Sequence, residues 1–80
     1  MEYKIDLINH KFEIIKEEVN KWKPFSLASE EVEKLLIDAE ELKKNLKFEH
    51  EMNKLNSLIA QLKQYIYDIQ SLVEQNPKTV

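Results

Sequence analysis

The chain has 80 residues, a net charge of −3, no glycine and no cysteine. The lack of cysteine excludes disulfides, thiolate metal sites and thiol catalysis, and the length suits a single domain, residues 1–80, with one small hydrophobic core. All 12 basic residues are lysine, and because arginine provides most two-pronged contacts to phosphates and guanine edges, we expect no binding to nucleic acid.

The first predicted helix spans residues 3–22. Its apolar residues recur at steps of three and four, which is the spacing of one helical face. They are Ile5, Ile8, Phe12, Ile15, Val19 and Trp22. Leu7 and Ile14 lie beside this stripe and widen it, so the helix has room for two neighbouring helices. The helix ends before Lys23-Pro24, because proline lacks a backbone donor and disfavours helical geometry in the preceding residue.

The segment after the first helix is expected to close one end of the core. Phe25 follows directly, and we expect it to pack beside Trp22. Ser26 or Ser29 is expected to cap the second helix by accepting a hydrogen bond from a free amide in its first turn. At the opposite end of the core, we expect Tyr3 to provide the cover.

The second predicted helix spans residues 27–46. Its stripe consists of Ala28, Val32, Leu35, Ala39, Leu42 and Leu46. Acidic residues gather in its first turns and lysines near its end, which suits the positive and negative ends of a helix dipole. Ile37 falls outside the stripe and is a candidate for contact with a partner.

Residues 47–51 contain neither glycine nor proline. The break between the second and third helices is therefore inferred from the angular positions of the two apolar stripes around the helix axis. At about 100° per residue, the stripes before and after this segment would lie roughly 140° apart on one straight helix. A turn within residues 47–51 lets both stripes face a common core. The alternative is a helical hairpin with one long C-terminal helix, which would dimerise into a larger bundle.

The third predicted helix spans residues 51–75 and ends before Asn76-Pro77, which leaves a short polar tail at residues 76–80. Its stripe consists of Met52, Leu55, Ile59, Leu62, Ile66, Ile69 and Val73, widened by Leu58, Tyr65 and Leu72. With short connections, three such helices favour an all-α fold, an antiparallel up-down-up three-helix bundle.

Residues able to support catalysis are few and scattered. His10 is expected on the outer face of the first helix, and His50 in the second connection. A helical Glu-x-x-His metal site is ruled out at both, since Leu7 and Lys47 stand where the glutamates would be. The sequence therefore predicts no enzyme activity, no cofactor, no metal site and no small-molecule substrate.

The third helix is poor in charge. Between Leu55 and Val73, only Lys63 and Asp68 are charged. Because protein interfaces are depleted in charge and enriched in tyrosine, we expect its outer face to bind a partner protein. The candidate contact residues are Gln61, Gln64, Tyr67, Gln70 and Ser71, together with Ile37 of the second helix.

These features predict a non-catalytic protein–protein interaction module, in the style of a small adaptor, a chaperone, an inhibitor, or an immunity or antitoxin protein. Two alternatives stay open: a structural homo-oligomer of helical bundles, and a nucleic-acid-associated regulator whose binding would weaken steeply with salt. No apolar stretch approaches the roughly 18 residues of a membrane span, and the first residues include acids. We therefore expect no membrane insertion and a cytoplasmic location.

Overall fold

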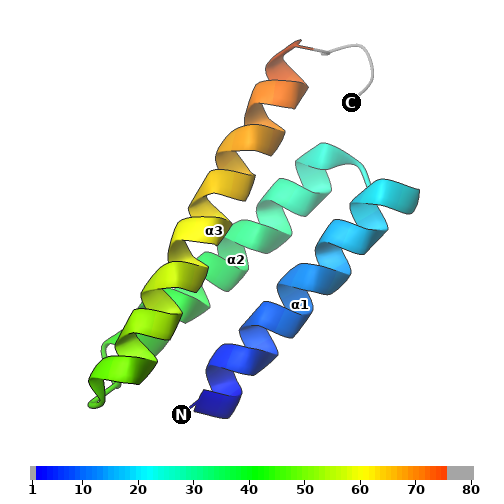
Figure 1. Ribbon diagram of the computed structural model, residues 1–80. Coiled ribbons are helices and arrows are strands. Elements are labelled where there is room, and N and C mark those ends of the chain that lie inside the picture. Colours follow the sequence, from blue (N-terminus) through cyan, green and yellow to red (C-terminus); the bar gives the residue numbers. More distant parts are fainter. Residues whose placement is uncertain (1, 76–80) are drawn as a thin grey trace.

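In the computed structural model of this chain, residues 2–75 are described and form three helices, α1 (Glu2–Lys21), α2 (Phe25–Lys43) and α3 (Glu49–Gln75). The helices run up, down and up (Figure 1). α2 contacts both other helices, most extensively α3, whereas α1 and α3 contact each other least. The all-α three-helix bundle is confirmed, and the hairpin with one long C-terminal helix is wrong. The predicted tail at residues 76–80 lies outside the described residues.

The core is built by the three predicted stripes. The buried apolar side chains are Ile5, Ile8, Phe12, Ile15, Ala28, Val32, Leu35, Ala39, Leu42, Leu46, Leu55, Leu58, Ile59, Leu62 and Ile69. Ala28 and Ala39 are fully buried, and their small side chains let neighbouring helices approach α2 closely. Phe12 of α1 and Tyr65 of α3 meet edge to face, with ring centroids 5.2 Å apart. This aromatic pair joins the two helices that contact each other least.

Trp22 lies outside the core, contrary to the prediction, with 64% of its surface exposed. Just beyond the end of α1, the backbone N–H groups of Trp22 and Lys23 both donate to the carbonyl oxygen of Glu18, at 2.8 Å each. The chain therefore leaves the helical path at Trp22, and it is Phe25 that packs against the core here. Tyr3 is also exposed, at 68%, and does not cover the opposite end.

Lys23 anchors the corner between α1 and α2. Its side chain is only 5% exposed, and its ammonium group forms ion pairs with Glu18 of α1, at 3.0 Å, and with Glu31 of α2. The pKa of Lys23 is raised above its ordinary value, first by the hydrogen bond that it donates to Glu31, while its desolvation opposes the rise. A buried but fully paired lysine thus takes the place at this corner that we expected Trp22 to fill.

The first turn of α2 has no side-chain cap, so the expected caps by Ser26 or Ser29 are wrong. The N-cap residue is Pro24, with extended backbone angles of φ −64° and ψ 146°, and its carbonyl oxygen accepts a hydrogen bond from Ala28 at 3.1 Å. Proline suits the start of a helix because its fixed φ is already helical and its missing donor is not needed there. Ser29 instead lies one turn into α2 and is buried.

The connection between α2 and α3 is a tightened turn at residues 44–48. Lys44, Asn45 and Leu46 each donate a backbone hydrogen bond to the carbonyl three residues earlier, at 3.2, 3.0 and 3.3 Å. No residue among 2–75 has a positive φ, so this turn forms without glycine. Leu46 is buried and fixes the turn to the core. The predicted break between the two helices is confirmed, but it lies at residues 44–48 and not within residues 47–51, and His50 lies inside α3.

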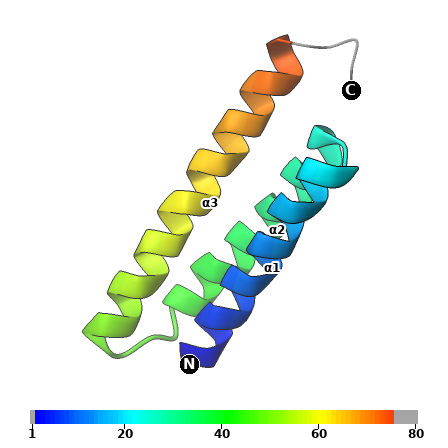
Figure 2. The ribbon, with the colours of Figure 1, turned by 45° about the vertical axis from the view of Figure 1, so that its right-hand side comes forward.

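The two ends of α3 differ in their surroundings. Glu51, in its first turn, is only 6% exposed, where the free amides at a helix N-terminus favour a carboxylate. Figure 2 shows that the C-terminal end of α3 extends beyond the ends of α1 and α2. Within residues 2–75, no helix has both the length and the apolar content needed to cross a lipid bilayer.

Candidate interaction surfaces

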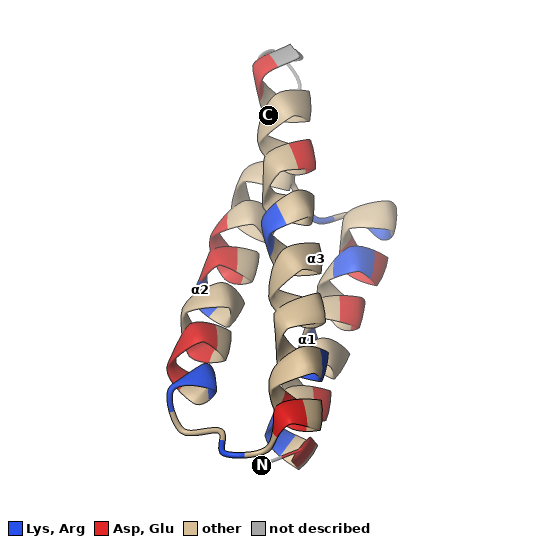
Figure 3. Ribbon diagram, turned by 60° about the vertical axis from the view of Figure 1, so that its left-hand side comes forward, with Lys and Arg blue, Asp and Glu red and all other residues tan. Residues whose placement is uncertain are grey.

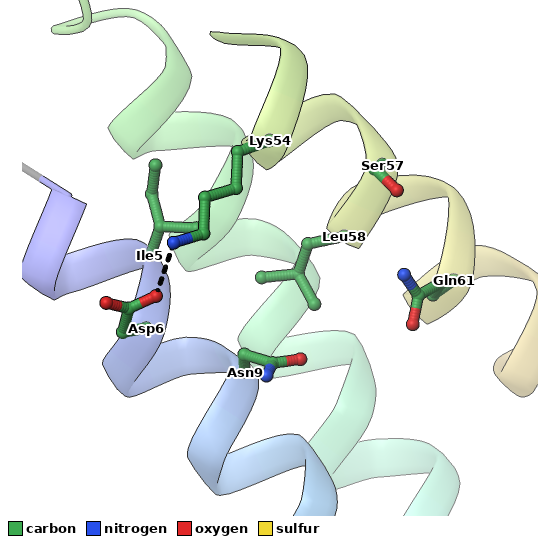
Figure 4. Close-up of a pocket in the computed structure, with 7 residues that line it drawn as sticks. All are labelled: Ile5, Asp6, Asn9, Lys54, Ser57, Leu58 and Gln61. Carbon is green, nitrogen blue, oxygen red and sulfur yellow. Dashed lines mark hydrogen bonds and ion pairs between the residues drawn. The ribbon is translucent and has the colours of Figure 1, made fainter. Parts of the chain in front are cut away.

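The predicted contact residues of α3 do not form one surface, because Gln61 faces α1. It lines a hollow of about 270 Å³ between the two helices, together with Asp6 of α1 and Lys54 of α3 (Figure 4). The ammonium group of Lys54 bridges the helices by pairing with Asp6 at 2.7 Å and with Glu2 at 3.3 Å. Both interactions raise the pKa of Lys54 above its ordinary value, and the hydrogen bond to Asp6 is the largest cause.

Gln70 lies on the opposite side of α3, against α2. Its amide donates a hydrogen bond of 3.3 Å to the carboxylate of Glu33, which joins the two helices at the surface. Ile37 is one turn along α2 from Glu33, and Tyr67 is one turn along α3 from Gln70 in the same direction. Ile37 is 58% exposed and Tyr67 is 67% exposed. We call the surface formed by Glu33, Ile37, Tyr67 and Gln70 the α2/α3 face.

Gln64 and Ser71 contribute little to that face. The amide of Gln64 donates to the carboxylate of Asp68 on α3 itself, at 2.9 Å, and Ser71 is half-buried. Figure 3 shows α3 largely free of charge beside an α2 rich in acidic residues. Of the six predicted residues, Gln70 is joined to α2 through Glu33, whereas Gln61 faces α1 on the other side of α3.

A second surface, between α1 and α2, was missed by the sequence reasoning. Leu7 and Ile14, expected to widen the core stripe, remain 49% and 42% exposed. They border two neighbouring grooves of about 390 and 330 Å³ between the helices. We define the α1/α2 face by these grooves, with Tyr3, Lys4, Leu7, Lys11 and Ile14 from α1 and Lys34, Asp38 and Glu41 from α2.

The signal for this second surface is present in the sequence. Tyr3, Leu7 and Ile14 are separated by four and seven residues, which places them on one side of α1. At about 100° per residue this side lies roughly opposite the core stripe. Treating Leu7 and Ile14 as the margin of the core stripe concealed a separate stripe that includes Tyr3.

Residues that could ligate a metal are dispersed within residues 2–75. No group of three or more histidine, aspartate or glutamate side chains converges there as it would around a metal ion. His10 is exposed, as predicted. His50 is also exposed, and its ring lies 6.1 Å from that of Phe48.

Comparison of the chain with protein-family models, with curated proteins and with solved structures finds no match. The two exposed faces of the bundle are therefore the features of this molecule that bear on its function.

Proposed function

We propose that this protein is a non-catalytic protein–protein interaction module that binds a partner protein through its α2/α3 face. The observation that carries the proposal is the exposure of Ile37 on α2 and Tyr67 on α3, at 58% and 67%, each one helical turn from the hydrogen-bonded pair of Glu33 and Gln70. A tyrosine and an aliphatic residue offer a partner apolar area that stays hydrated in the free protein.

The surroundings of these two residues support the same proposal. Gln70 and Glu33 are already joined by a hydrogen bond beside them, so their side chains need little further ordering when a partner binds. The adjacent outer face of α3 carries few charges that would have to lose water on binding. We further propose a cytoplasmic setting for the interaction, on the strength of the composition.

The test compares two tyrosines of equal exposure on different faces. Immobilised wild-type protein, Tyr67→Ala and Tyr3→Ala are incubated with lysate of the source cells, and the proteins retained are quantified. Tyr3 is 68% exposed and serves as the matched control. We expect one partner to be retained by the wild type and by Tyr3→Ala, and to be lost at least about tenfold with Tyr67→Ala, which corresponds to about 1.4 kcal/mol.

Ile37→Gln provides a second variant on the same face. It should reduce retention of the same partner, because it removes the apolar contact that α2 provides. Retention that is unaffected by either change on the α2/α3 face, or reduced equally by Tyr3→Ala, would overturn the proposal.

A further inference from the structure

The α1/α2 face exposes a helix that is apolar on two sides. α1 buries Ile5, Ile8, Phe12 and Ile15 in the core, yet Leu7 and Ile14 remain 49% and 42% exposed on its other side. A helix that is apolar all round normally has both sides covered. Tyr3, at 68% exposure, extends this second stripe towards the N-terminus.

The charges of the same face are separated by helix. Lys4 and Lys11 line the groove from α1, whereas Asp38 and Glu41 line it from α2. Within residues 2–75, the side chains of these four residues form neither ion pairs nor hydrogen bonds. In the groove around Leu7, the α1 edge is therefore basic and the α2 edge is acidic, and neither is neutralised by its own chain, whereas Lys34 of α2 lies in the neighbouring groove beside Ile14.

We propose that the α1/α2 face binds the same face of a second copy of this chain. With a two-fold axis parallel to the helices, α1 of each copy lies against α2 of the other. Rotation about such an axis does not shift any residue along the helix direction. The basic edge of one copy therefore lies opposite the acidic edge of the other at the same level. Lys11 then faces Asp38 of the second copy, and Lys4 faces Glu41 of the second copy.

This arrangement also covers the apolar stripe. α1 and α2 of the two copies form four antiparallel helices, with Leu7 and Ile14 of both copies directed towards the space between them. A two-fold axis across the helices would instead set α1 against α1 and bring the basic edges together, which like charges oppose. The separation of charge by helix thus selects one pairing, and it makes the chain complementary to itself.

The decisive experiment exchanges the charges of one predicted contact. Lys11→Glu sets two acids against each other in a homodimer, and Asp38→Lys sets two lysines against each other. When the two variants are mixed, both contacts of the heterodimer again join opposite charges. Sedimentation equilibrium over a range of concentrations, with circular dichroism to monitor helicity, measures each variant alone and the equimolar mixture.

We expect the wild type to form a concentration-dependent dimer. Each single variant should dissociate at concentrations on the order of tenfold higher, and the mixture should regain the wild-type affinity. A wild type that stays monomeric at the highest concentration, single variants that dimerise as the wild type does, or a mixture no tighter than its components would each overturn the proposal.

Apolar substitutions give a second test that does not depend on charge. Leu7→Gln should weaken the dimer about tenfold, whereas Ile37→Gln, a similarly exposed aliphatic residue on the α2/α3 face, should leave it unchanged. Equal weakening by both variants would contradict the assignment. Because the two faces share none of the substituted residues, failure of this proposal leaves the partner-binding proposal standing, and the reverse also holds.

Discussion

The α1/α2 face and the α2/α3 face both expose apolar side chains, but they do so in different surroundings. On the first, Leu7 and Ile14 follow one helix, between unpaired lysines and unpaired acids. On the second, Ile37 and Tyr67 come from two helices, beside a hydrogen-bonded amide and carboxylate. A low density of charge and a continuous apolar stripe are therefore separate properties, and in this molecule they lie on different surfaces.

The position of each helix in the bundle explains the difference. α2 is the middle helix and packs against both others, so most of its apolar residues are enclosed, and its exposed large apolar residues are Leu27 and Ile37. α1 packs mainly against α2 and only sparsely against α3, so Leu7 and Ile14 on its other side stay exposed. The surplus apolar surface of α1 thus follows from its place at the edge of a three-helix arrangement.

The largest expected effect would distinguish the inner side of α3 from its outer side. Leu62 is completely buried, so Leu62→Ala should lower the free energy of unfolding by about 2–5 kcal/mol, because the core loses packing and a cavity remains. Gln64→Ala, two residues away on the outer side, should change it by less than about 0.5 kcal/mol. Urea denaturation followed by circular dichroism measures both, and comparable losses would contradict the division of α3 into an inner and an outer side.

The sequence predicted this inner side well and the outer surfaces poorly, for a physical reason. Residues that must avoid water repeat at a fixed spacing, so the stripes and the presence of a break between the second and third helices could be predicted, although the break lies a few residues earlier than expected. Gln61 and Gln70 are nine residues apart, so at about 100° per residue they lie on opposite sides of α3. The sequence contains this signal, but it does not show which helix packs against each side. Likewise, nothing local indicated that Lys23, and not Trp22, would close the corner.

A smaller effect is expected at the two lysines that join helices. Lys23→Ala should lower the urea midpoint more than Lys54→Ala does. Lys23 is almost enclosed between Glu18 and Glu31, and its loss leaves two neighbouring carboxylates without a cation. Lys54 lies at the solvent-exposed seam of α1 and α3, where its ion pairs are screened by water and salt.

Salt provides the control for this pair of lysine variants. Raising the ionic strength should reduce the effect of Lys54→Ala more than that of Lys23→Ala, because exposed ion pairs are screened more strongly than enclosed ones. If Lys54→Ala lowered the urea midpoint as much as Lys23→Ala or more, the ion pairs of Lys23 at the corner between α1 and α2 would not be the more stabilising of the two sets.

The pH dependence of stability should depend on the two lysines and on one tyrosine. The pKa values of Lys23 and Lys54 are raised by their hydrogen bonds to carboxylates, and burial raises the pKa of Tyr65 above its ordinary value of 10.0. Because each pKa is higher in the folded state, the folded protein holds these protons more strongly, and the stability they confer is complete below the ordinary pKa values.

That stability should be lost as the pH rises above about 10. Urea midpoints measured from pH 8 to pH 11 would show the decline, and Tyr65→Phe should make it shallower by removing one of the titrating groups. A steeper decline in Tyr65→Phe, or a midpoint that increases above pH 10, would mean that the environment of Tyr65 is more polar than its packing against Phe12 implies.

The smallest expected effect concerns the two exposed tyrosines, which test whether both faces are surfaces at all. Tyr3 and Tyr67 are 68% and 67% exposed, so replacing either with alanine should change the free energy of unfolding by less than about 0.5 kcal/mol. Alanine also has the higher helix propensity, which offsets part of the packing that the ring provides. Thermal and urea denaturation, measured at low protein concentration to exclude a contribution from association, should therefore give nearly wild-type midpoints for both. If Tyr67→Ala were strongly destabilising while Tyr3→Ala was neutral, Tyr67 would be part of the α2–α3 packing, and the α2/α3 face would be reduced to Ile37.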